Sequence, residues 1–237
     1  RHLTGASYAR FDKPVHFYKG TAMAGIVTEF HMTDPKRGYV GGFQLEKLGL
    51  GAAFSTSCLN TWGDNPAQEW QAAWGKPFMD WMENYVCLAG NWIIGEDMPQ
   101  ETNRITLDPE VKDQYGLPVA HIHFDDHDND KAMRKFAWER SQEMYGAAGA
   151  VGGAKVLQRG NRGPYSATHN LGSMRMGDDP SKSVVNRYGQ THDVKNLFVC
   201  DGSIFTTGGG QNPTLTIVAL AMREGDYIAD ECRKGNL

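Results

Sequence analysis

Residues 169–227 read HNLGSMRMGDDPSKSVVNRYGQTHDVKNLFVCDGSIFTTGGGQNPTLTIVALAMREGDY and place three local signals in order. First, His169 precedes a turn of small residues. Second, a short apolar run from Leu197 to Cys200 ends in the step Asp201-Gly202. A run of this kind is typical of a buried strand. Third, Asn212-Pro213 opens an apolar segment. Asn is a favoured N-cap and Pro a favoured first helical residue, so a helix is predicted from here to about residue 230.

The order of these signals resembles the C-terminal end of the glucose-methanol-choline (GMC) family of flavin oxidoreductases, which oxidise alcohols and sugars with FAD. The resemblance is strongest over residues 165–228. The opening segment, RHLTGASYARFDKPV, is similar to the family segment that follows the first part of the FAD domain. The sequence NPTLT, with Asn rather than His, resembles bacterial sugar and polyol dehydrogenases. The resemblance therefore implies oxidation of a sugar or polyol hydroxyl, with hydride transfer to FAD.

The dinucleotide-binding fingerprint of such enzymes has no counterpart in this sequence. GMC proteins begin with a strand, a GxGxxG turn and a helix that hold the FAD pyrophosphate. No GxGxxG occurs here. We therefore expect the C-terminal half of a GMC protein, which needs a chain carrying the GxGxxG half of the FAD domain. The alternative is a non-catalytic partner-binding subunit, or a remnant of a split GMC enzyme.

The resemblance assigns catalysis to His169 and Asn212. Alcohol oxidation by a flavin needs a base for the hydroxyl proton, and a His that is neutral near pH 7 can accept it. His169 matches the family's catalytic His by its place in HNLGSMRMG. Asn212 matches the second family position, which is His or Asn. An Asn does not titrate, so Asn212 is expected to orient the substrate hydroxyl by hydrogen bonding.

Five residues are expected to contact the cofactor. Asp201 and Gly202 follow the predicted buried strand, and ligands of open α/β sheets bind at that end of a strand. Asn212, Pro213 and Thr214 open the predicted helix, whose N-terminus carries a partial positive charge. The resemblance places this N-terminus against the flavin ring, where it would stabilise the anionic reduced flavin.

The fold class predicted is α/β, with an α+β substrate domain. We expect an antiparallel sheet backed by helices, plus the C-terminal part of an FAD-binding Rossmann-like domain. A glycine-rich break at residues 146–163 separates a GMC-like substrate-binding domain, residues 1–160, from a C-terminal segment of the FAD-binding domain, residues 161–237. Within the first domain the residue pattern predicts strands over 24–31, 38–46, 86–94, 104–107 and 119–124, and helices over 66–85 and 128–145.

Charge and composition exclude several other functions. A formal net charge of −4 argues against nucleic-acid binding through bulk charge. No apolar run approaches the roughly 18 residues of a membrane span. The compartment stays open between cytoplasm and periplasm. Four scattered cysteines form no CxxC, so buried free thiols are expected rather than structural zinc.

A second cluster of potential ligands offers a less favoured function. His121 and His123 alternate on a predicted strand, and His127 follows among Asp125, Asp126 and Asp128. This pattern has the residue types of a metal site, and it would suit a metal-dependent hydrolase. An exposed acidic turn explains the same residues more simply, so no metal is expected.

Overall fold

The computed structural model describes residues 1–21, 23–48, 75–76, 79, 83, 85–151, 155–157 and 169–237. Most of the predicted helical region 66–85 and the predicted domain boundary at residue 160 lie outside these residues. The chain forms two compact units. The sheet unit contains Leu3–Gly95 and Asp128–Ser166, and the C-terminal unit contains Arg1–His2, Glu96–His127 and Ala167–Leu237.

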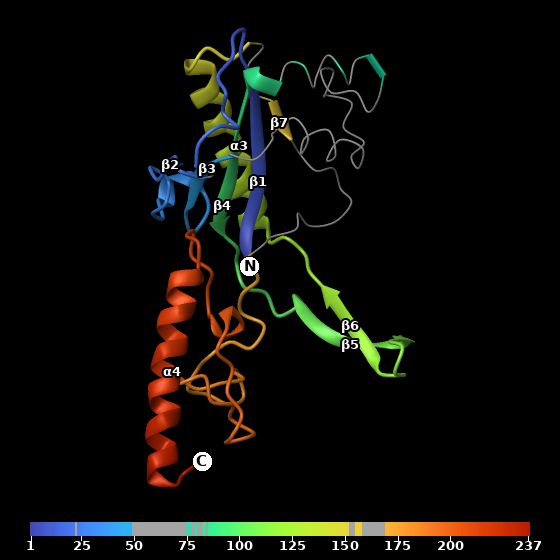
Figure 1. The fold of residues 1–237 in the computed structure, drawn as a ribbon, viewed down its shortest axis with the longest axis vertical. Helices are drawn as coiled ribbons and strands as arrows, with labels where there is room; N and C mark the ends of the chain where they lie inside the picture. Colours follow the sequence, from blue (N-terminus) through green and yellow to red (C-terminus); the bar gives the residue numbers. More distant parts are fainter. Residues whose placement is uncertain are drawn as a thin grey trace. The chain divides into compact units, whose positions relative to one another are not determined.

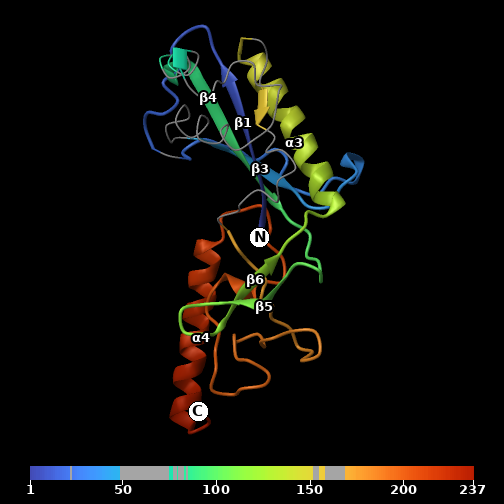
Figure 2. The same cartoon turned by 90° about the vertical axis from the view of Figure 1, so that its right-hand side faces the viewer.

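A five-stranded sheet forms the centre of the sheet unit, and one long helix covers one of its faces (Figures 1 and 2). The strand order is β2-β3-β4-β1-β7, and the pairs β2–β3, β3–β4 and β1–β7 are antiparallel. The elements are β1 (His2–Arg10), β2 (Ile26–Val27), the 3-10 turn η1 (Pro35–Arg37), β3 (Phe43–Lys47), the 3-10 turn η2 (Tyr85–Cys87), β4 (Leu88–Glu96), α3 (Asp128–Ala147) and β7 (Lys155–Leu157). The predicted antiparallel sheet backed by a helix is therefore confirmed.

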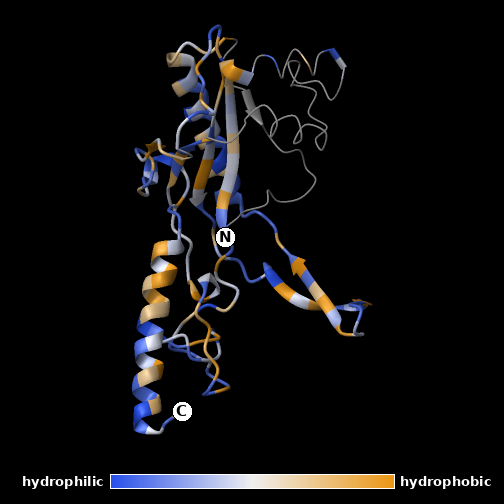
Figure 3. Ribbon diagram, in the orientation of Figure 1, coloured by the Kyte–Doolittle hydropathy of each residue, from blue (hydrophilic) through white to orange (hydrophobic). Residues whose placement is uncertain are grey.

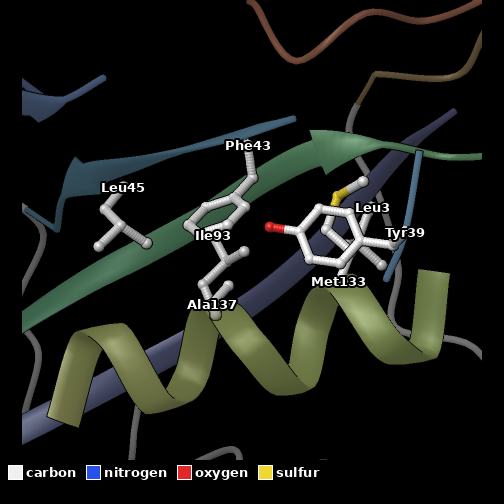
Figure 4. Packing of buried hydrophobic residues seen from close by; sticks show 7 residues of the cluster. All are labelled: Leu3, Tyr39, Phe43, Leu45, Ile93, Met133 and Ala137. Carbon is white, nitrogen blue, oxygen red and sulfur yellow. The ribbon is translucent and has the colours of Figure 1, made fainter. Parts of the chain in front are cut away.

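The core of this unit lies between the sheet and α3. Figure 4 shows Met133 and Ala137 of α3 directed at the strands, where they meet apolar side chains from β1, β3 and β4. Gly95 of β4 lets the helix approach closely, since a Cβ there would lie 2.8 Å from the sulfur of Met133. The buried members of the cluster are Leu3, Tyr39, Phe43, Leu45, Ile93, Met133 and Ala137.

Two segments form the regular structure of the C-terminal unit. The first is the antiparallel hairpin β5 (Arg104–Lys112) and β6 (Pro118–His123), and the second is α4 (Thr214–Lys234). A 3-10 turn, η3 (Gly202–Ile204), precedes α4. The aromatic ring of Tyr227 on α4 stacks on Tyr188, with ring centroids 4.1 Å apart. None of the helices described in the structure is long and apolar enough to cross a bilayer.

The predicted buried strand from Leu197 to Cys200 is wrong. Phe198 makes only an isolated bridge with Gln190, and the Leu197 side chain is 51% exposed. Residues 189–191 lie beside this segment: the N–H of Thr191 donates to Leu197 and the N–H of Val199 donates to Gly189, each at 2.9 Å. This pairing amounts to a single bridge, which is too short to form a strand ladder. The exposed thiols of Cys200 and Cys232 also differ from the expected buried cysteines.

The C-terminal unit presents large apolar side chains to solvent on two elements. Figure 3 shows hydrophobic residues along the hairpin and along the N-terminal half of α4. On α4 the exposed apolar side chains recur at spacings of three and four, so they share one face. These two surfaces, called here the hairpin face and the α4 face, comprise Ile105, Leu107, Leu117 and Ile122, and Leu215, Val218 and Met222.

Candidate active site

His169 is held against a second histidine, His2, at the start of β1. The two Nδ1 atoms lie 2.9 Å apart, within hydrogen-bond distance. The rings meet edge to face, at 85° and with centroids 4.9 Å apart. The backbone N–H of His2 also donates to the carbonyl oxygen of His169 at 3.3 Å. Two contacts therefore join His169 to His2.

His2 is fully buried and makes a second hydrogen bond. Its Nε2 lies 2.9 Å from the carbonyl oxygen of Gly208, in the glycine run before α4. The pKa of His2 is lowered from 6.5 to about 4, chiefly by burial and in part by the nearby His169, while the bond to Gly208 opposes the shift. His2 is therefore neutral at physiological pH.

An arginine next to His2 ties this strand end to the base of the hairpin. The guanidinium of Arg1 donates from Nε to Asp97 at 3.2 Å and from Nη2 to Asp126 at 3.3 Å. The same group lies 3.6 Å from the ring centroid of Phe124, a cation–π contact. These side chains are mostly buried, so the ion pairs are weakly screened. The contacts hold the backbone that carries His2.

The segment after His169 runs beside the 3-10 turn that contains Gly202. The N–H of Gly172 donates to the carbonyl of Gly202 at 3.2 Å, and the N–H of Met174 donates to Ser203 at 2.8 Å. A Cβ on Gly202 would lie 2.7 Å from a methyl of Leu171 and 3.2 Å from a methyl of Ile217 on α4. Gly202 is therefore the point at which the His169 segment and the first turns of α4 pack together.

Asp201 caps the same 3-10 turn. Its carboxylate accepts a hydrogen bond from the backbone N–H of Ser203 at 2.7 Å, and its side chain faces solvent. One carboxylate oxygen is thus engaged locally, while the residue stays accessible to a ligand. This arrangement allows a cofactor contact but does not require one.

The helix predicted to be capped by Asn212 begins one residue later than expected. α4 starts at Thr214, and its N-cap is Pro213 rather than Asn212. Pro213 has φ −87° and ψ −10°, which are helical values, and it takes the N-cap position predicted for Asn212. A proline side chain accepts no hydrogen bond, and the first turn contains no acidic residue. Pro213 therefore provides no side-chain cap for the N–H groups of this first turn. Asn212 and Thr214 are both exposed.

The histidine-rich segment that suggested a metal site is an exposed hairpin end. His123 Nε2 lies 3.0 Å from an oxygen of Asp125, and both side chains are more than half exposed. No group of three or more potential ligands is arranged around one point within the described ranges. No metal-dependent function is therefore proposed.

The sequence missed His2, Arg1 and Gly208 as part of the site. The only local signal of Arg1 and His2 is that two polar residues stand together at the head of a strand, and such a pair has no specific meaning. The partners of His2 lie 167 and 206 positions away along the chain. Only the folded structure brings them together.

The fold and the sequence pattern around His169 define a class of protein. A family model described as GMC oxidoreductase matches residues 99–221. The chain belongs to the GMC oxidoreductase family.

Particular relatives narrow the similarity. The chain is 40% identical over 218 residues to 2-methyl-1,2-propanediol dehydrogenase of Mycolicibacterium austroafricanum. This alignment covers 90% of this chain and 37% of the relative. It is 31% identical over 242 residues to the gluconate 2-dehydrogenase flavoprotein of Pantoea cypripedii. That alignment covers 95% of this chain and 37% of the relative. The chain thus spans little more than a third of the length of these relatives.

A solved structure shares the fold. The crystal structure of pyridoxine 4-oxidase from Mesorbium loti matches 95% of this chain and 42% of its own, with a TM-score of 0.59 and 15% sequence identity. Identity this low supports the common fold alone.

Proposed function

We propose that this chain supplies the substrate domain and the catalytic pair of an FAD-dependent enzyme that oxidises a sugar or polyol hydroxyl. The observation that carries the proposal is His169, which the fold holds by one ring nitrogen and by its backbone. A base held in this way leaves its other nitrogen for a substrate. The names of the relatives, a diol dehydrogenase and a gluconate dehydrogenase, support a polyhydroxylated substrate.

The roles of the two proposed catalytic residues are distinct. FAD, when bound, supplies the acceptor for the carbon-bound hydride. His169 takes the proton of the reacting hydroxyl, which allows the carbon–oxygen double bond to form. Asn212 hydrogen-bonds the same hydroxyl and orients it, since an amide cannot take the proton.

The start of α4 fits a flavin ring that gains negative charge. Its N-cap residue, Pro213, makes no side-chain capping bond and its first turn contains no acidic residue, so Pro213 and Thr214 would hold the ring against a partial positive charge. Asp201 and Gly202 would hold the rest of the cofactor, with Asp201 exposed beside a backbone turn. None of these residues belongs to a GxGxxG turn, which would bind the pyrophosphate of FAD.

We further propose that the GxGxxG half of the FAD domain covers the hairpin face and the α4 face. That half is carried either by the same polypeptide or by a partner chain. Leu215 and Met222 are 83% and 69% exposed, although monomeric proteins rarely leave contiguous apolar surface open. Tight, stoichiometric FAD binding by these 237 residues alone would contradict this part of the proposal.

The decisive experiment replaces His169 in the protein that contains both halves. His169→Ala should lower the rate of anaerobic single-turnover flavin reduction by about 10²–10⁴-fold, the usual contribution of a general base. Asn212→Ala should have a smaller effect, because it removes orientation rather than proton transfer. His192→Ala is a matched control, since His192 lies in the same unit and its ring lies 3.0 Å from the hydroxyl of Ser183 rather than against His169. Near-normal flavin reduction by His169→Ala would refute the base assignment.

The substrate class needs a separate comparison. A set of sugars and polyols should reduce the flavin faster than simple monohydric alcohols of similar size. Preferred oxidation of the simple alcohols would remove the sugar or polyol assignment while leaving the chemistry intact.

A further inference from the structure

The hydrogen bonds of His2 determine which of its nitrogens carries a proton. Nε2 of His2 lies 2.9 Å from the carbonyl oxygen of Gly208, and a carbonyl oxygen only accepts. Nε2 must therefore be the donor. A neutral imidazole has a single N–H, so Nδ1 of His2 is left as a lone pair.

The same argument then fixes His169. Its Nδ1 lies 2.9 Å from the Nδ1 of His2, which has a lone pair and no proton. The Nδ1 of His169 must therefore donate. A neutral His169 then has no proton on Nε2, and this nitrogen makes no hydrogen bond to any residue in the described part of the chain.

We propose that His2 is a positioning residue that fixes His169 in the tautomer with a protonated Nδ1 and a basic Nε2. The proposal rests on the proposed function of His169 as the base. It adds that Nε2 of His169 is the atom that accepts the proton and that His2 is the residue that keeps this nitrogen unprotonated. The second ring nitrogen of a functional His commonly sets its tautomer through such a hydrogen bond.

The proton transfer balances at named atoms. The substrate hydroxyl gives its proton to Nε2 of His169, and the carbon–hydrogen bond breaks as its hydride leaves for the flavin. The hydroxyl carbon becomes a carbonyl carbon, and His169 becomes a cation with its Nδ1–H still bonded to His2.

The cation is expected to stay on His169. His2 is buried and has a pKa of about 4, so it resists a second proton and keeps its Nδ1 available as an acceptor. The N–H of His2 to Gly208 holds the His2 ring in place while this happens. His2 thus acts on the reaction only through His169.

The first test reads the tautomers directly and needs no variant. Long-range ¹H–¹⁵N correlation spectra of the complete enzyme labelled with [¹⁵N]histidine report which ring nitrogen is protonated. At pH 7 His169 should show a protonated Nδ1 and a bare Nε2, and His2 the reverse. A protonated Nε2 on resting, neutral His169 would overturn the proposal.

The second test removes the acceptor and then restores it. In His2→Leu, His169 should shift towards the Nε2-protonated tautomer, and kcat should fall by about 10- to 100-fold, the usual effect of removing the partner that orients a functional His. In His2→Asn the amide oxygen replaces Nδ1 as acceptor, so the tautomer and most of kcat should return. His192→Asn, elsewhere in the same unit, should change neither.

The outcomes separate this inference from the proposed function. An unchanged tautomer and an unchanged kcat in folded His2→Leu would overturn the positioning role. A shifted tautomer with normal flavin reduction would instead overturn His169 as the base. Equal loss in His2→Leu and His2→Asn, without any change of tautomer, would assign His2 a purely structural role and also overturn the proposal.

Discussion

The two units of the molecule differ in how much of their own core they contain. The sheet unit buries Leu3, Phe43 and Ile93 completely between its strands and α3. In the described residues of the C-terminal unit, Val185 and Ile204 are the only large apolar side chains that are fully buried. Yet this second unit carries His2, His169 and the start of α4. The candidate chemistry therefore lies on the unit whose apolar surfaces most need a further partner.

Core truncation should expose this difference most strongly. Phe43→Ala removes a fully buried ring and should lower the free energy of unfolding by about 3–5 kcal/mol. Leu215→Ala, at a side chain that is 83% exposed, should change it by less than about 0.5 kcal/mol in the same chain. Chemical denaturation of both variants measures the contrast. Equal losses would mean that α4 is already packed within this chain.

A charge on the hairpin face should distinguish the chain alone from the protein with both halves. Leu107→Asp puts a carboxylate where we propose that the other half packs, and an unpaired buried charge costs about 3–5 kcal/mol. In the chain alone the effect should be within about 0.5 kcal/mol, since Leu107 is 70% exposed there. Lys112→Asp, on the exposed end of the same strand, is the matched control. Flavin retention and thermal unfolding report the result. If Leu107→Asp lowered neither in the complete protein, the hairpin face would not be covered by the other half.

The buried His2 should make the stability of the protein depend on pH. Its folded pKa is about 4 and its ordinary value is 6.5, so between these values the unfolded state binds more protons than the folded state. Stability should therefore be full above pH 6.5 and fall as the pH drops towards 4, by at most about 3 kcal/mol. His2→Asn should flatten this part of the pH profile of unfolding, whereas His192→Asn should not. A profile that is the same with and without His2 would show that the imidazole is not buried in solution.

A carboxylate at the start of α4 should have the smallest effect on folding and a clear effect on the flavin. Thr214→Asp adds a negative charge to the first turn and should stabilise the helix by about 0.3–1 kcal/mol. The same charge should repel an anionic reduced flavin and lower its reduction potential in the complete enzyme. Redox titration compares it with Ala229→Asp, placed far along the same helix. A raised or unchanged potential would place this helix away from the flavin ring.

The sequence predicted the helix α3 and the strands β2, β3 and β4 of the sheet unit because their signals are local, and it missed β1 and β7. The helix predicted over 128–145 is observed as Asp128–Ala147, and the strand predicted over 86–94 is observed as Leu88–Glu96. The strand predicted over 24–31 is much shorter, with only Ile26–Val27 paired. Periodic apolar residues that pack on a nearby sheet identify an element well. The pattern fixes its ends less well, because the ends depend on neighbouring segments.

The sequence predicted less about the candidate site. The roles of His169, Asn212, Asp201 and Thr214 stay predictions, since they rest on resemblance to the family. Leu197 to Cys200 was wrongly predicted to be a buried strand, because the pattern describes a strand that has neighbours. His2 escaped notice because its role depends on contacts with His169 and Gly208 that no local pattern encodes.

The base of the β5–β6 hairpin is closed twice, and this bears on how the chain would respond to a protease. Arg1 joins Asp97, before the hairpin, to Asp126, after it, while Asn103 and Asp125 exchange hydrogen bonds of 2.8 and 3.0 Å. The tip at Tyr115-Gly116 is exposed and is the natural place for a cut. A single nick there would break the chain but not the ladder or its closed base. The two fragments should therefore stay together with His2 and His169 still in contact, and cleavage would be invisible until the protein is denatured.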